Sequence, residues 1–266
     1  MAITSRPQIP LPFGQMTTPS YSLGYLNDPI DKRDYHYEGS LSLGRLAEGV
    51  DYSSRMSPVR DQGKRRSCVA HAICAILEAK GKKLDLSEEM LYELICEPGG
   101  GAYPRQACKV LQRLGVSREQ FWPYEKKATD PISTRYVIDW TEHRRALGDA
   151  KKWKIERYVA LDGRDVMQAS LVENGPFALG LNWEKSWFSV SPQKGEILHV
   201  VKKSDVVGGH MVCVVGTSGR GAGTIWKIRN SWGKQWGQGG YAWITDDAIW
   251  YAKGRAWALY YSPHIK

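Results

Sequence analysis

Apolar residues recur at helical spacing through the first half of the chain, and polar residues fill the positions between them. Ser87, followed by two glutamates, has the form of a helix N-cap, and Gly115 has the form of a helix stop. The pattern predicts three helices, at residues 67–80, 87–95 and 105–114.

The pattern changes after about residue 150. Residues 164–174 predict one more amphipathic helix, which Gly175 and Pro176 stop. Short apolar runs separated by glycines then predict strands: FALGLN (177–182), EILHVV (196–201), MVCVVG (211–216), TIWKIRN (224–230) and YAWIT (241–245). Helices followed by strands indicate an α+β fold in two lobes, a helical one at about 60–150 and a β-rich one at about 151–266.

Residues 1–48 differ in composition from the rest of the chain. They contain five prolines among threonine, serine and glycine, which is typical of extended or loop-like chain. Their densest part is GYLNDPIDKRDYHYE, residues 24–38. We therefore divide the chain into an N-terminal extension, residues 1–48, and a main domain, residues 49–266.

Composition and charge argue against several classes of function. No apolar stretch approaches the roughly 20 residues that span a bilayer, and the N-terminus lacks the apolar region of a secretory signal. The location stays open between the cytoplasm and export by a route without a signal peptide. The net charge of +9 is spread in short groups instead of a basic stripe, so we expect no nucleic-acid partner.

The five cysteines form no CxxC pair, and their odd number leaves at least one thiol free. A dense disulfide framework is therefore excluded and a metal site is poorly supported. We expect a reducing compartment, or no requirement for disulfides.

One cysteine stands where a loop becomes a helix. Cys68 follows the basic triplet of Lys64, Arg65 and Arg66 in the stretch QGKRRSCVAH. A helix N-terminus lowers the pKa of a thiol, and the thiolate is the nucleophilic form. The triplet either points to water, or favours the thiolate and attracts acidic substrates.

Three polar residues could serve a thiolate nucleophile. His210 leads a strand after two glycines, Asn230 ends another strand, and Gln62 lies six residues before Cys68. Thiolate catalysis uses an imidazole base, a group that orients it and a donor to the oxyanion. A lone histidine beside glycines is more often structural, and a lone asparagine before serine is usually a turn residue. The occurrence of all of these residues together, in this order along the chain, favours a catalytic role over a structural one.

In this order the residues resemble the papain-like cysteine peptidases. VDYSSRMSPVRDQGKRRSCVAHA resembles the family segment that runs through the nucleophile, and GGHMVCVVG resembles its histidine strand. IRNSWGKQWGQGGYAWI is similar to the family signature NSWG…WG…GY, the most specific of the three. The resemblance covers roughly residues 50–245 and is closest in pattern to bacterial members with a short N-terminal extension.

The resemblance implies a role for each reactive group. Cys68 would be the nucleophile and His210 the general base that then protonates the leaving amine. Asn230 would orient the imidazole, and Gln62 would form the oxyanion hole with the Cys68 backbone N–H.

Three more residues receive roles on the substrate side. Trp232 would shield the bond between the asparagine and the histidine from water, and Gly100 and Gly101 would pair with the substrate backbone. His71 lies three residues after Cys68, and we expect it to be structural instead of a second base. The stretch IWYAKGRAWALYY, where the family has its specificity-pocket floor, does not follow the family pattern.

The implied activity is hydrolysis of peptide bonds through an acyl-thioester on Cys68, in a cleft between a helical lobe and an antiparallel, barrel-like β lobe. No metal or organic cofactor is implied. The implied partners are a peptide or protein substrate and a proteinaceous inhibitor, and we expect a monomer. The alternatives are acyl transfer or deamidation at the same Cys–His site, and a non-catalytic binding module. Residues 1–48 either cross the cleft or pack away from it.

Overall fold

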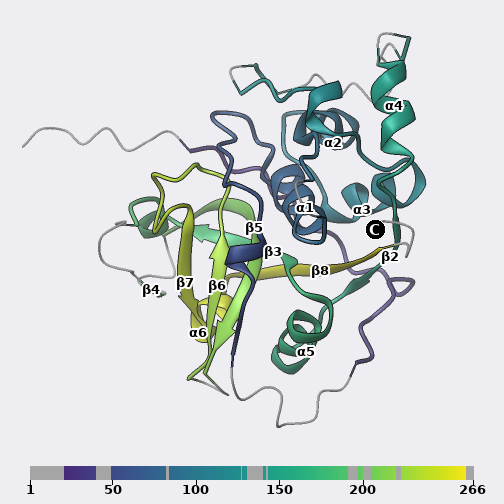
Figure 1. Cartoon of the computed structure of the whole chain (residues 1–266). Helices are drawn as coiled ribbons and strands as arrows, with labels where there is room; N and C mark the ends of the chain where they lie inside the picture. The colour runs from purple at the N-terminus through teal and green to yellow at the C-terminus, as the bar shows by residue number, and fades with distance from the viewer. Residues whose placement is uncertain are drawn as a thin grey trace, which may run out of the picture.

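The structure is a computed structural model, shown in Figure 1. It describes residues 21–39, 49–81, 84–126, 128–130, 140–141, 143–190, 197–199, 205–219 and 223–261. Helices α1 to α4 gather on one side of the molecule, and the strands lie with α5 and α6 on the other side (Figure 1).

The helical lobe is built around one fully buried helix. Its helices are α1 (Cys68–Glu78), α2 (Glu88–Ile95), α3 (Pro104–Arg113) and α4 (Arg144–Ala150). Every residue of α1 is buried, which explains its alanine-rich apolar sequence. The Ser87 side chain accepts a hydrogen bond from the Met90 N–H, so α2 begins at the N-cap that the sequence predicts.

A sheet forms the second lobe. Its strands are β1 (Val50–Asp51), β2 (Ile155–Ala160), β3 (Phe177–Glu184), β4 (Ile197–Leu198), β5 (Val206–Ser218), β6 (Ile225–Arg229), β7 (Tyr241–Thr245) and β8 (Lys253–Tyr261). The order is β2-β8-β3-β5-β6-β7-β4, with β1 paired to β5. All described pairs are antiparallel except β4 with β7, which is parallel. Helices α5 (Arg164–Asn174) and α6 (Asp246–Ala252) and three short 3-10 helices, at Ser53–Arg55, Glu119–Phe121 and Lys185–Phe188, complete the described elements.

Strand β5 joins the two lobes because it is buried on both faces. Met211 and Cys213 belong to the hydrophobic core that contains α1, whereas Val212 and Val214 belong to the core that contains Trp183. Side chains alternate between faces along a strand, so one apolar run supplies both cores. The strand thereby places His210, the residue before Met211, at the boundary between the lobes.

The α+β fold with two lobes is confirmed. The three early helices and the helix at 164–174 lie where the sequence predicts them. Of the predicted strand at 196–201 the structure describes residues 197–199, where Ile197–Leu198 is strand, and the rest of the prediction lies outside the described residues. Strands β2 and β8 and helices α4 and α6 were not predicted.

Candidate active site

Cys68 is the first residue of α1 and has no exposed surface. Burial raises the pKa of its thiol to about 11, whereas backbone hydrogen bonds from Met211 and Gly24 lower it. The prediction of a thiolate is therefore wrong for this state, because desolvation outweighs the helix N-terminus. The thiol is protonated at neutral pH while it stays covered.

His210 lies in β5, and its Nε2 is 2.7 Å from the Asn230 Oδ1. The same oxygen accepts a hydrogen bond from the Ser231 N–H at 2.7 Å, which identifies it as the amide oxygen. Nε2 must therefore carry the proton, and Nδ1 is left as the acceptor. Within the described part of the chain Nδ1 has no hydrogen-bond partner.

The environment keeps the His210 imidazole neutral. Burial lowers its pKa to about 4, while the hydrogen bond to Asn230 raises it. The next residue, Met211, hydrogen-bonds to the Cys68 sulfur through its backbone. His210 is therefore the neighbour in sequence of Met211, whose backbone contacts the thiol. Its neutral imidazole has a free ring nitrogen that can accept a proton.

Tryptophan rings enclose this histidine. The Trp232 ring lies 4.4 Å from the His210 ring and the Trp183 ring lies 4.8 Å from it, measured between centroids. Both tryptophans are buried. Their rings exclude water from the hydrogen bond between His210 and Asn230, which strengthens it.

Gln62 is buried and its amide is held at both ends. Its Oε1 accepts a hydrogen bond from the Ser231 Oγ at 2.6 Å, so its Nε2 faces the cleft. That Nε2 donates to the carbonyl oxygens of Ser22, at 3.1 Å, and Arg65, at 2.7 Å. Gln62 therefore presents an amide N–H to a carbonyl oxygen, as an oxyanion donor must.

Ser231 was not singled out in the sequence. It links Gln62 and Asn230, because its hydroxyl holds one amide and its backbone N–H holds the other. In the sequence, its position directly after Asn230 in the NSWG run was the signal that could have identified it as a site residue.

The N-terminal extension covers the nucleophile. The Gly24 carbonyl accepts a hydrogen bond from the Ala102 N–H at 2.8 Å, and the Leu26 N–H donates to the Ala102 carbonyl at 3.0 Å. The Tyr25 N–H donates to the Gly209 carbonyl at 3.0 Å. Residues 24–26 therefore lie between the two lobes, paired to one lobe at Ala102 and to the other at Gly209.

The same segment covers the rest of the site. Tyr21 stacks on Trp232 with 4.3 Å between ring centroids. A side chain at Gly24 would meet the Arg66 carbonyl oxygen at 1.9 Å, so only glycine fits over the start of α1. We call residues 21–26 the cleft segment.

The two glycines that were predicted to pair with the substrate backbone lie beside Ala102, the residue whose backbone pairs with the cleft segment. Gly101 packs against the cleft segment, since a Cβ there would come within 2.8 Å of the Gly24 carbonyl oxygen. Gly100 lies next to the side chains of Asp130 and Arg66. The backbone hydrogen bonds are made by Ala102, one residue further along the chain.

The basic triplet does not form a charged rim. The Arg65 side chain is 1% exposed and forms an ion pair with Glu89, so it neither points to water nor reaches a substrate. Arg66 lies 3.8 Å from Asp130 and hydrogen-bonds to the Gly99 carbonyl. Both expectations for the triplet are therefore wrong at Arg65: its guanidinium ties the active-site loop to α2.

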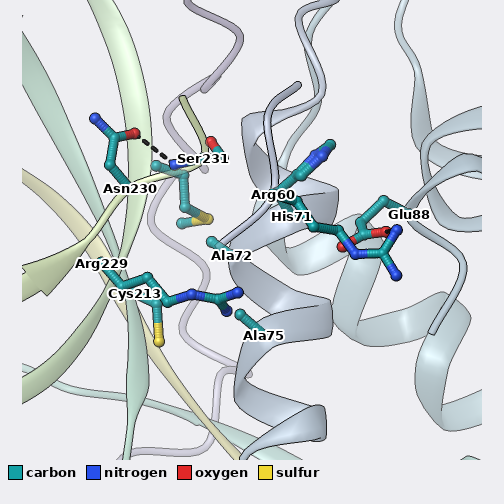
Figure 2. A pocket seen from close by; sticks show the side chains of 10 residues that line it. Arg60, His71, Ala72, Ala75, Glu88, Cys213, Arg229, Asn230 and Ser231 are labelled. Carbon is teal, nitrogen blue, oxygen red and sulfur yellow. Dashed lines mark hydrogen bonds and ion pairs between the residues drawn. The ribbon is translucent and has the colours of Figure 1, made fainter. Parts of the chain in front are cut away.

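His71 packs behind the site. Its Nδ1 is 3.1 Å from the Ser67 carbonyl oxygen, and burial lowers its pKa to about 3. It borders a cavity of about 10 Å³ whose lining also includes Arg60, Glu88 and Asn230 (Figure 2). These contacts agree with the structural role expected for His71.

These groups define a class of enzyme. A thiol lies at a helix N-terminus and contacts the backbone of the residue that follows a histidine, and an amide fixes the tautomer of that histidine. A second amide donates to a carbonyl oxygen. Together they can carry out acyl transfer through a thioester.

Comparison with known proteins identifies the family. Residues 46–253 match the family model described as papain family cysteine protease, so the chain belongs to that family. It is 30% identical over 245 residues to cysteine proteinase 3 of Entamoeba histolytica, covering 89% of this chain and 75% of that protein. It is 26% identical over 231 residues to cathepsin K of Mus musculus, covering 83% of this chain and 64% of that protein.

A solved structure is similar over almost its whole length. Xylellain, a cysteine protease from Xylella fastidiosa, superposes with a TM-score of 0.75 at 25% identity, covering 91% of this chain and 97% of that chain. The chain spans between 56% and 66% of the length of five other curated relatives. The family membership makes this protein a cysteine peptidase, a hydrolase.

Proposed function

We propose that Cys68 and His210 hydrolyse peptide bonds, with Asn230 and Gln62 in supporting roles. The Cys68 proton passes to the His210 Nδ1, and the sulfur attacks the carbonyl carbon of the scissile bond. The oxygen that becomes negative is stabilised by the Gln62 Nε2 and by the Cys68 backbone N–H. The imidazolium returns its proton to the leaving amine nitrogen, and water then cleaves the acyl-thioester.

The observation that carries this proposal is the fixed tautomer of His210. Asn230 Oδ1 is 2.7 Å from Nε2, and Nδ1 has no other partner among the described residues. A neutral imidazole with a free Nδ1, in the residue before Met211, whose backbone contacts the Cys68 sulfur, can act as a general base. No observation favours transglutamination, deamidation or a non-catalytic module.

We also propose that the cleft segment lowers the activity of the full chain by covering the active site. It places the Gly24 backbone at the Cys68 sulfur, the Ser22 carbonyl at the Gln62 amide and the Tyr21 ring on the Trp232 ring. A substrate needs the same three places.

The chain after the cleft segment is anchored. Asp28 accepts hydrogen bonds from the Arg105 N–H at 3.0 Å and from the Trp257 Nε1 at 3.0 Å. Asp34 forms ion pairs with Arg105, at 2.6 Å, and Arg255, at 3.1 Å. These anchors span both lobes, so they hold the extension across the cleft.

A hydrolysis assay tests the proposed activity. The full chain, and a variant with Tyr25→Ala that weakens the cleft segment, would be given fluorogenic peptides. We expect hydrolysis that Cys68→Ala and His210→Ala abolish to within the background rate, and faster hydrolysis by Tyr25→Ala than by the unmodified chain. Unchanged hydrolysis by Cys68→Ala would contradict the role of the thiol.

A monomeric state and recognition by a proteinaceous inhibitor stay predictions. Among the described residues, no helix combines the length and the apolar character needed to cross a bilayer.

A further inference from the structure

The hydroxyl of Tyr124 contacts the loop that carries Gln62 and leads into α1. It donates a hydrogen bond to the Gln62 carbonyl oxygen at 2.9 Å, and it lies 2.7 Å from the Ser67 Oγ. Ser67 is buried and directly precedes Cys68. One phenol oxygen therefore joins the residue whose side chain faces the oxyanion to the residue before the nucleophile.

The hydrogen bonds around this hydroxyl run in one direction. A carbonyl oxygen only accepts, so the Tyr124 hydroxyl gives its proton to Gln62, and the Ser67 hydroxyl must donate to the phenol oxygen. By the same rule the His71 Nδ1, which is 3.1 Å from the Ser67 carbonyl oxygen, carries a proton. Burial raises the pKa of Tyr124, so the phenol keeps the proton that it donates. The Ser67 hydroxyl thereby directs the phenol proton toward Gln62.

The backbone of Gln62 is held from both lobes. Its N–H donates to the Ser231 carbonyl at 2.8 Å, and its carbonyl accepts from Tyr124. That carbonyl belongs to the peptide before Gly63, whose φ of +64° lies in the left-handed region. Glycine leaves such a peptide plane free to rotate unless its polar groups are held. The Gly63 N–H is held by Asp61 at 2.8 Å, and Tyr124 holds the carbonyl at the other end of the peptide.

The Tyr124 side chain is itself fixed by contacts that do not use its hydroxyl. The Arg65 guanidinium carbon lies 5.4 Å from the centroid of its ring, and the His71 ring meets it edge-on with 4.8 Å between centroids. The Tyr124 N–H donates to the Glu119 Oε1 at 2.9 Å. A side chain that is locked by its surroundings can hold the group it contacts in one place. Phenylalanine at this position would keep these contacts and lose the hydroxyl alone.

We propose that Tyr124 is a positioning residue for the oxyanion hole, and that its hydroxyl acts by fixing the backbone of Gln62. The inference rests on the proposed peptidase function and adds a residue that acts through the glutamine. An oxyanion donor stabilises the transition state only if it lies about 2.7–3.1 Å from the oxygen that becomes negative. Movement of the Gln62 backbone moves its Nε2 away from that place, so the loss falls on kcat more than on KM.

The first test is Tyr124→Phe in the Tyr25→Ala background. We expect kcat for a fluorogenic peptide to fall about fivefold, as one hydrogen bond allows, while KM stays the same. Tyr52→Phe in that background is the matched control, because the Tyr52 hydroxyl also donates to a backbone carbonyl, that of Val172 in α5, at 3.3 Å. It should leave kcat unchanged.

A double-mutant cycle shows whether the tyrosine acts through the glutamine. Gln62→Ala removes the side-chain donor and should lower kcat by about 10²-fold or more. If Tyr124 only positions that donor, Tyr124→Phe should cause no further loss once the donor is absent.

Alkylation separates the oxyanion hole from the thiol. Iodoacetamide transfers its carbamoylmethyl group to the Cys68 sulfur as iodide leaves, and no oxyanion forms in this reaction. The Cys68 labelling rate should therefore be the same with and without Tyr124→Phe.

The outcomes separate this inference from the proposed function. A kcat in Tyr124→Phe equal to that in Tyr52→Phe would overturn the positioning role and leave the peptidase function standing. So would a fivefold loss that persists in Gln62→Ala, or a labelling rate that falls together with kcat. Failure of the Tyr25→Ala chain to cleave any peptide would overturn both.

Discussion

Asn230 accepts two hydrogen bonds at one oxygen. The Ser231 N–H fixes which end of the amide faces His210, and the amide oxygen then fixes which ring nitrogen is protonated. The sequence could indicate the members of this triad by their order, but not Ser231, whose role depends on where its hydroxyl and N–H point. It also could not show that the Cys68 pKa is raised, because the covering segment lies far from Cys68 in sequence.

Removal of the Asn230 amide should reduce turnover without abolishing it. In Asn230→Ala the nucleophile and base remain, but neither the tautomer nor the ring orientation of His210 is fixed. We expect kcat to fall on the order of 10²-fold, within the range of positioned acid–base catalysis, while KM changes little. Steady-state kinetics measure both constants, and wild-type kcat in this variant would remove Asn230 from the mechanism.

Lowering the pH should reduce the free energy of unfolding through protonation of His210. Its pKa is lowered from 6.5 to about 4 in the folded chain, so the stability that the neutral imidazole contributes is present above pH 6.5 and is lost as the pH falls toward 4. The total is about 3 kcal/mol at most. The difference in unfolding free energy between wild type and His210→Ala should therefore shrink from pH 7 to pH 4.5. Urea unfolding at the two pH values measures it, and a difference independent of pH would contradict the assigned pKa.

At the scale of elements, the buried apolar runs were predictable and the irregular edges were not. The run MVCVVG was recognised as a strand because both of its faces are apolar. Strand β8 was not predicted, and its charged residues Lys253 and Arg255 are atypical of a buried strand. In the structure Asp34 of the extension pairs with Arg255. A single sequence does not show such a distant partner.

The loop before α1 is held to α2 by a buried ion pair. Arg65→Ala leaves Glu89 buried without its partner, so we expect a loss of about 3–5 kcal/mol of unfolding free energy. Arg66→Ala is the control, because that side chain is 52% exposed and should cost no more than about 1 kcal/mol. Urea unfolding of both variants gives the comparison. Equal losses would contradict the assignment of Arg65 as a structural residue.

At the scale of the whole molecule, the extension and the two lobes form one closed arrangement. Hydrogen bonds join the cleft segment to Ala102 in the helical lobe and to Gly209 in the sheet lobe. The sequence predicted that the extension is extended chain, but it left open whether the extension crosses the cleft or packs away from it. An extended segment has no residue pattern that shows what it contacts. The same closure that buries Cys68 also buries Tyr25.

The most direct test of this account is the rate at which an epoxide alkylates each of the five cysteines, followed by mass spectrometry of the full chain. All five thiols are buried, and Cys68 lies under the cleft segment, which we propose to be displaced when the site opens. We predict that Cys68 is labelled first, that Tyr25→Ala raises its labelling rate at least tenfold, and that His210→Ala in that background lowers it again. Labelling of Cys74 or Cys213 as fast as Cys68, or a Cys68 rate unchanged by either substitution, would contradict a histidine-activated nucleophile masked by the N-terminal extension.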